Sequence, residues 1–200
     1  MTSKPYTSRA EKKQRTRKAL IDAAADLLAS NGIRGTTLEA VADRAGLHVQ
    51  TLYRHFSNKG ELFAALEESL FLEQKALLED SEREASTMEV RYGMDVANLR
   101  SLHQDGVKNA LVSLTDPEWA GVHMLSSYRY EDLLSEHLAR ELGCEPNDPE
   151  PRLLAAMLQW GATSVLRSMD DATARSEEAM LALYKRTFDL IAEVQESFAR

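Results

Sequence analysis

Residues 48–59 read HVQTLYRHFSNK and bring together side chains that can hydrogen-bond to flat polar groups and to anions. Gln50 can form two hydrogen bonds to the edge of adenine, and the methyl groups of Val49 and Thr51 can contact the methyl group of thymine. Side chains suited to phosphate oxygens follow in the same run, namely Tyr53, Arg54, His55 and Lys59. The run therefore combines candidate base contacts with candidate phosphate contacts.

The spacing of apolar residues predicts that this run forms a short helix, from about residue 48 to residue 55. Leu52 and Phe56 are four positions apart, so they face a core and hold the helix in place. A shorter helix precedes it, and Gly46 ends that helix because the chain there needs a positive φ. Two short helices joined by such a turn form a helix-turn-helix, whose second helix enters the major groove with its first residues against the bases. His48 is then either a base contact or the exposed first residue of this helix.

Capping signals predict where the neighbouring helices begin and end. Thr36 and Glu39 have the spacing of a capping box at the start of the second helix, and Asn58 and Glu61 have it at the start of a long fourth helix. The fourth helix continues to about residue 80, which indicates that it joins two bodies. The first helix is expected from about residue 9 to residue 30, with Asn31-Gly32 as its stop signal.

The charge is divided unevenly along the sequence. The chain has a formal net charge of −8, yet its first 60 residues hold eleven Lys and Arg against five Asp and Glu. The other 140 residues hold thirteen Lys and Arg against 27 Asp and Glu. A basic segment on an acidic protein indicates either a polyanionic partner, such as DNA, or a solvated basic tail.

Helical periodicity continues through the rest of the chain, so we predict an all-α protein. Further helices are expected near residues 88–114, 118–127, 130–142, 149–169 and 175–198. The sequence has no apolar run long enough to span a membrane, and its single cysteine, Cys144, fits a reducing cytoplasm. We therefore expect a cytoplasmic protein with no membrane association.

Residues 36–62, TTLEAVADRAGLHVQTLYRHFSNKGEL, resemble the DNA-binding signature of the tetracycline-repressor (TetR) family. The positions that fit are Thr37, Val41, Ala42, Ala45, Gly46, Leu47, Thr51, Leu52, Tyr53, His55, Phe56, Lys59 and Leu62. The resemblance covers about residues 10–65. It departs at His48, where the family usually has a capping Ser or Thr, and at Gln50, where a small residue is common.

The resemblance implies a role for several residues and an architecture for the chain. It implies that Gln50 and Thr51 face bases, and that phosphate is contacted by Thr37, Tyr53, His55 and Lys59. It also implies a helix-turn-helix DNA-binding domain over residues 1–60 and a helical effector-binding and dimerisation domain over residues 61–200, about nine helices in all. The last two helices carry apolar stripes wider than one buried face requires, which favours a homodimer interface there over a plain core pair in a monomer.

A ligand site in the middle helices is the least specific prediction. If the resemblance holds, these helices enclose a pocket for a small, mostly apolar effector with one polar group. Aromatic residues and methionines with a few polar groups can line such a pocket, although each of them is more often ordinary core. The candidates are Tyr92, His103, Trp119, His123, Met124, Tyr128 and Trp160.

Together these observations favour a ligand-responsive transcriptional regulator. It would be a repressor that binds palindromic double-stranded DNA as a dimer and leaves it when the effector binds. The alternatives are a DNA-binding protein without an effector and a helical enzyme or carrier. The sequence has no nucleophile elbow, phosphate-binding loop, paired carboxylates on one face or metal-ligand spacing, so we expect no enzyme activity, no metal and no cofactor.

Overall fold

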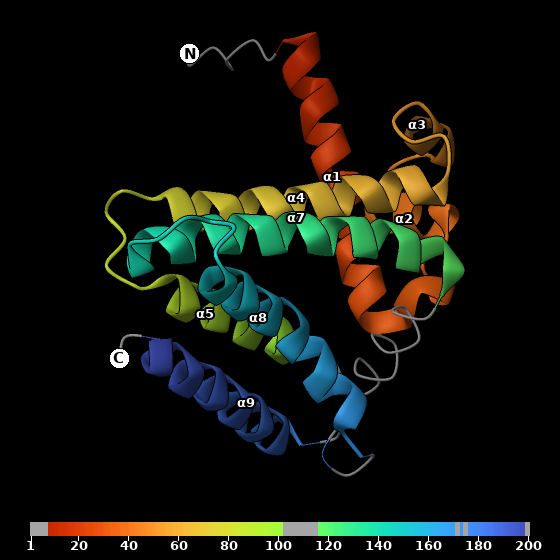
Figure 1. Cartoon of the computed structure of the whole chain (residues 1–200). Helices are drawn as coiled ribbons and strands as arrows, with labels where there is room; N and C mark the ends of the chain where they lie inside the picture. The colour runs from red at the N-terminus through yellow and green to blue at the C-terminus, as the bar shows by residue number, and fades with distance from the viewer. Residues whose placement is uncertain (1–7, 102–115, 171–172, 174–175, 199–200) are drawn as a thin grey trace, which may run out of the picture.

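The computed structural model describes residues 8–101, 116–170, 173 and 176–198, and the chain is all-α within them. A basic module of three helices is followed by a helical bundle, in which α4 and α7 lie side by side above α5, α8 and α9 (Figure 1). The helices are α1 (Arg9–Gly35), α2 (Leu38–Arg44), α3 (Val49–Tyr53), α4 (Lys59–Glu79), α5 (Thr87–Ser101), α7 (Pro117–Leu142), α8 (Pro149–Ser168) and α9 (Glu177–Phe198). The predicted fold class is confirmed.

The first helix bends where its stop signal was predicted. Gly32 has a φ of 67° and interrupts the helical backbone, and a last turn follows it to Gly35. At the other end Ser8 and Glu11 form a capping box that the sequence analysis did not anticipate. Buried residues of α1, α2 and α3 form one core with Leu62 of α4, and its members are Leu20, Ala23, Ala24, Val41, Ala42, Leu52, Phe56 and Leu62.

Both predicted capping boxes are corrected by the structure. Thr37, not Thr36, caps α2, and its hydroxyl oxygen accepts a hydrogen bond from the backbone N–H of Ala40 at 3.2 Å. Thr36 is buried, so its hydroxyl needs a partner inside the protein and donates to the carbonyl oxygen of Gly32 at 2.8 Å. Asn58 caps α4 as predicted, whereas the Glu61 carboxylate bonds to the backbone and hydroxyl of Ser57 instead of closing a box with Asn58.

The segment predicted as two helices near residues 118–127 and 130–142 is one helix, α7. Its middle residues Ser126 and Ser127 are buried, and packing outweighs the weak helix preference of serine. Helices α4 and α7 run in the same direction, since Phe63 packs on Trp119 at one end and Phe71 packs on Tyr130 further along. Helix α4 begins in the N-terminal core and ends in the core of the bundle, so it joins the two bodies as expected.

The last two helices pack against each other and against the rest of the bundle. Their inner residues, including Leu154, Leu158 and Ile191, belong to the bundle core. Their outer faces keep large apolar side chains in solvent, with Leu153 49% exposed and Leu190 53% exposed. Among the described residues, none of the helices is apolar over a length that would cross a bilayer.

Candidate nucleic-acid interface and effector cavity

Helix α3 presents one face to solvent and buries the other. Leu52 is fully buried in the N-terminal core, and Phe56, which follows the helix, is 1% exposed. Gln50 and Tyr53 lie on the exposed side, where Tyr53 keeps half of its surface in solvent. The remaining predicted contacts divide between exposed residues (Thr37, His48, Arg54) and half-buried residues (Val49, Thr51, His55, Lys59).

The turn before α3 has the geometry that the sequence predicted. Gly46 has a φ of 66°, a backbone conformation that a residue with a Cβ adopts only at a cost. His48 is the N-cap residue of α3, and its side chain makes no capping hydrogen bond. The first backbone N–H groups of α3 therefore receive no capping bond from His48, and a phosphate oxygen could satisfy them.

Arg17 of α1 holds the other end of α3, and the sequence analysis assigned it no such role. Its Nη1 donates a hydrogen bond of 3.2 Å to the carbonyl oxygen of His55, and its guanidinium lies over the ring of Phe56, 4.3 Å from the centroid. Burial lowers the pKa of His55, and the nearby charges of Lys13 and Arg17 lower it further. His55 is therefore neutral near pH 7, and the basic start of α1 lies beside the end of α3.

The half-buried side chain of Lys59 is held by contacts within the protein. Its ammonium donates to the carbonyl oxygen of Ile33 in the last turn of α1 and lies 5.4 Å from the centroid of the Phe63 ring. An ammonium has three N–H groups, so a phosphate contact from the same side chain is compatible with this anchor. The anchor also ties the start of α4 to the end of α1.

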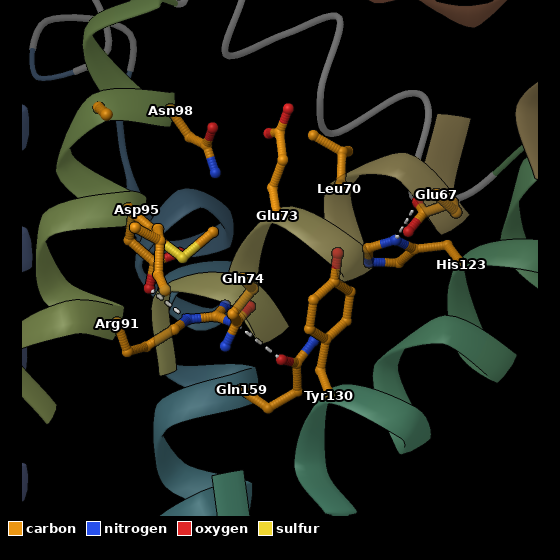
Figure 2. A pocket seen from close by; sticks show the side chains of 13 residues that line it. Glu67, Leu70, Glu73, Gln74, Arg91, Asp95, Asn98, His123, Tyr130 and Gln159 are labelled. Atoms are coloured by element: carbon orange, nitrogen blue, oxygen red, sulfur yellow. Dashed lines mark hydrogen bonds and ion pairs between the residues drawn. The ribbon is translucent and has the colours of Figure 1, made fainter. Parts of the chain in front are cut away.

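A cavity of about 350 Å³ opens between α4, α5, α7 and α8 (Figure 2). This volume is in the range of small-molecule sites. Much of the wall is carbon, from aliphatic residues, an aromatic ring and the stems of long polar side chains. The lining residues are Glu67, Leu70, Glu73, Gln74, Leu77, Arg91, Met94, Asp95, Ala97, Asn98, His123, Tyr130 and Gln159.

The floor of the cavity is a buried hydrogen-bond network centred on Arg91. Its Nε donates to Asp95 at 2.8 Å, and its Nη1 donates to the side-chain oxygens of Gln159 at 3.0 Å and Gln74 at 3.3 Å. The hydroxyl of Tyr184 on α9 also donates to Asp95. Because a guanidinium only donates, the amide oxygens of both glutamines are fixed toward it. The network thus joins four helices under the cavity.

Among the predicted ligand residues that the structure describes, His123 alone lines this cavity. Trp119 lies behind it, 6% exposed, stacked on His123 at 6.0 Å between ring centroids. Tyr92 instead stacks on Tyr184 at 5.6 Å. Trp160 is half-buried, and Met124 and Tyr128 point to solvent, with 44% and 55% of their surfaces exposed. His103 lies outside the described residues.

The polar residues of the cavity are absent from the sequence-based prediction, which rested on aromatic residues and methionines. A polar residue in a helix normally faces solvent, so residue type alone gives no sign that Glu67, Gln74 and Arg91 are buried. A weak signal was present, since Gln74 and Leu78 are four positions apart on the buried side of α4. Only the packing of α5 and α7 against α4, and the bridge from Gln74 through Arg91 to Gln159 of α8, show that this side borders a cavity.

Comparison with known proteins connects the N-terminal module to one family. The family described as bacterial regulatory proteins, tetR family, matches residues 20–66. The transcriptional regulator TtgR of Pseudomonas putida is 39% identical over 74 residues, which are 37% of this chain and 35% of TtgR. The chain thus matches about a third of the length of that relative.

Similarity also extends beyond the N-terminal module. The transcriptional regulator TcmR of Streptomyces glaucescens is 26% identical over 162 residues, which cover 76% of this chain and 71% of TcmR. A solved SmeT–triclosan complex has the same fold, with a TM-score of 0.61 at 23% identity, over 90% of this chain and 91% of that one. The named relatives are transcriptional regulators, not enzymes. The helix-turn-helix segment thus matches the tetR family of bacterial regulatory proteins over residues 20–66, and the fold of the whole chain agrees with that match.

Proposed function

We propose that the protein is a ligand-responsive transcriptional repressor. It binds a palindromic operator as a homodimer in the cytoplasm and is released by a small, mostly apolar effector in the cavity between α4, α5, α7 and α8. The exposed face of α3 is the observation that carries the proposal. Gln50 and Tyr53 are held outward there because Leu52 and Phe56 anchor the opposite side in the core.

The residues around α3 support two kinds of DNA contact. Gln50 and Thr51, with Val49 and His48, would meet base edges, since the first residues of the second helix enter the major groove. The side chains around this helix would contact phosphate and set its orientation, and they are Thr37, Tyr53, Arg54, His55 and Lys59. A neutral His55 would act there as a hydrogen-bond donor.

A continuous series of contacts supports coupling between the cavity and the DNA-binding module. His123 forms part of the cavity wall and stacks on Trp119, which packs edge-to-face with Phe63 at 5.0 Å between ring centroids. Phe63 shares a core with Ile33 of α1 and lies under the ammonium of Lys59. A ligand that moves this wall would therefore move the module. It changes DNA affinity only if it binds one arrangement of the two reading heads better than the other.

The outer faces of α8 and α9 support the dimer. Leu153 and Leu190 are half exposed on two adjacent helices, and burying them against a second copy would remove apolar surface from water. A two-fold dimer would place two copies of α3 about 34–36 Å apart, one turn of DNA. The solved complex of SmeT with triclosan, a protein of this fold with a bound small molecule, supports a small-molecule effector for this chain.

Selection of duplex fragments from a random library by the purified protein tests the proposal. We expect a palindromic consensus. Gln50→Ala should change the preferred base at one position of each half-site, by about 1–3 kcal/mol of discrimination. The matched variant Arg54→Ala, at the C-terminal end of the same helix, should weaken all sequences alike and reduce the salt dependence. A protein that selects no duplex even in dilute buffer would contradict the proposal.

A further inference from the structure

The lining of the cavity carries more negative than positive charge. It has three carboxylates, on Glu67, Glu73 and Asp95, against one guanidinium, on Arg91. Asp95 and Arg91 are both buried and form an ion pair with 2.8 Å between Oδ2 and Nε. The charge of Arg91 is therefore already balanced, and it does not compensate the carboxylates of Glu67 and Glu73.

Glu67 is the unbalanced carboxylate that lies deepest. Only 4% of the surface of Glu67 is exposed, and its Oε1 lies 3.2 Å from Nδ1 of His123. The partner is an imidazole, which carries a full positive charge only in its protonated form. A buried carboxylate without a full opposite charge is costly. A positively charged ligand group beside the Glu67 carboxylate would supply this charge and would therefore be stabilised there.

Tyr130 gives an independent sign that the cavity receives a polar ligand. The residue is 9% exposed, and its hydroxyl has no hydrogen-bond partner among the described residues. Figure 2 shows that this hydroxyl points into the cavity, between Glu73 and the Glu67–His123 pair. Burial, together with the charge of Glu67, raises the pKa of Tyr130. The group therefore stays a neutral phenol, whose oxygen can accept a hydrogen bond from a ligand N–H.

We propose that the cavity takes an organic cation, a molecule with one protonated amine on a hydrophobic skeleton. The ammonium donates hydrogen bonds to the Glu67 carboxylate and the Tyr130 hydroxyl, and the skeleton packs against Leu70, Leu77 and Met94. Carboxylate ligands are rejected, because they would add a negative charge to a lining that already has an excess. This inference rests on the proposed function, since it takes the cavity to be the effector site.

Three naphthalene probes of matched shape test the charge preference by calorimetric titration of the full chain at pH 7. They are 2-naphthylmethylamine, which is a cation, the neutral alcohol 2-naphthalenemethanol, and the anion 2-naphthoate. We expect the amine to bind at least about tenfold more tightly than the alcohol, as charge-assisted hydrogen bonds at a buried site do. The naphthoate should bind most weakly. An amine that binds no more tightly than the alcohol overturns the inference.

Two adjacent variants locate the preference. Glu67→Gln removes the charge but keeps an oxygen that can accept from His123, and it should bring the amine to within about twofold of the alcohol. Glu68→Gln makes the same change one residue later, at a carboxylate outside the cavity that pairs with Arg129, and should leave the preference intact. Equal losses in both variants overturn the assignment to Glu67. The comparison of probes on the natural chain stays decisive if Glu67→Gln does not fold.

Release of the selected operator, measured by fluorescence anisotropy, separates this inference from the proposed function. If the amine binds as expected but leaves the protein on DNA, the cation site stands and effector-driven release fails. If other small molecules release the operator while the amine binds no better than the alcohol, the proposed function stands and the cation inference is wrong.

Discussion

Replacing Arg17 by alanine should loosen the helix that we propose enters the major groove, although Arg17 lies in a different helix. Its Nη1 donates to the carbonyl oxygen of His55, just after α3, where helix carbonyls lack partners within the helix. Its guanidinium also covers the ring of Phe56, which anchors α3 in the core. The substitution removes both contacts and leaves helix α1 intact, because alanine is a strong helix former.

The size of the effect follows from the two contacts. A hydrogen bond from a charged group contributes about 1.5–3 kcal/mol, and the half-exposed position of Arg17 reduces this to about 1 kcal/mol. A cation over an aromatic ring at a partly exposed site adds about 0.5–1 kcal/mol. We therefore expect the free energy of unfolding to fall by about 1.5–2 kcal/mol. For a chain of this length, that corresponds to a melting temperature lower by about 3–8 °C.

Thermal unfolding at one fixed protein concentration measures the effect, and Arg15→Ala is the matched control. Arg15 lies on the same helix and is exposed, so its loss should change stability by less than about 0.5 kcal/mol. Both variants remove one positive charge and should weaken DNA binding in dilute buffer. If Arg17→Ala melts at the temperature of Arg15→Ala, the two contacts of Arg17 do not stabilise the fold and this reasoning is refuted.

Two further predictions concern the dimer and the pH dependence of stability. Leu190→Glu should give a monomer by sedimentation at micromolar concentration. The control Leu72→Glu, equally exposed but on α4, should remain a dimer. A dimeric Leu190→Glu protein would argue against the α8–α9 interface. Burial lowers the pKa of His137, with Arg140 and Arg83 adding to burial and Glu79 and Glu136 opposing it. Its contribution to stability is complete above the unfolded pKa near 6.5 and is lost as the pH falls through the lower folded value. His137→Gln should therefore lose less melting temperature on acidification than the natural chain, and parallel curves would contradict this.

The N-terminal module could be predicted closely from the sequence because local signals determine it. Gly46 requires a positive φ, Leu52 and Phe56 have helical spacing, and Asn58 is a strong cap. The error in this module was also local. Thr36 and Thr37 are adjacent and chemically alike, and the choice between them depends on the bend at Gly32, which buries Thr36 against its own preceding turn.

The cavity could not be predicted in the same way, because its residues come from four helices. Arg91 on α5 meets Gln74 on α4 and Gln159 on α8, and these contacts span 17 and 68 positions of the chain. Periodicity identifies which face of a helix is apolar, but it does not show where polar residues of different helices meet in the interior. His123 was among the candidates because aromatic rings with a polar group can line a ligand site, whereas Glu67 resembles any charged residue on a helix surface.

The two sides of the cavity differ in how firmly they are held, and this difference bears on the response to a ligand. The floor is fixed by Arg91 and Asp95, a buried ion pair that also binds Tyr184 of α9. Such a pair is strongly destabilising to break, so the floor stays attached to the helices of the proposed dimer interface. The opposite wall is His123, held by one contact to Glu67 and by stacking on Trp119. A cation that takes over Glu67 would free His123 from that contact. We therefore expect the ligand to shift the wall that leads to α1, while the α8–α9 interface stays in place.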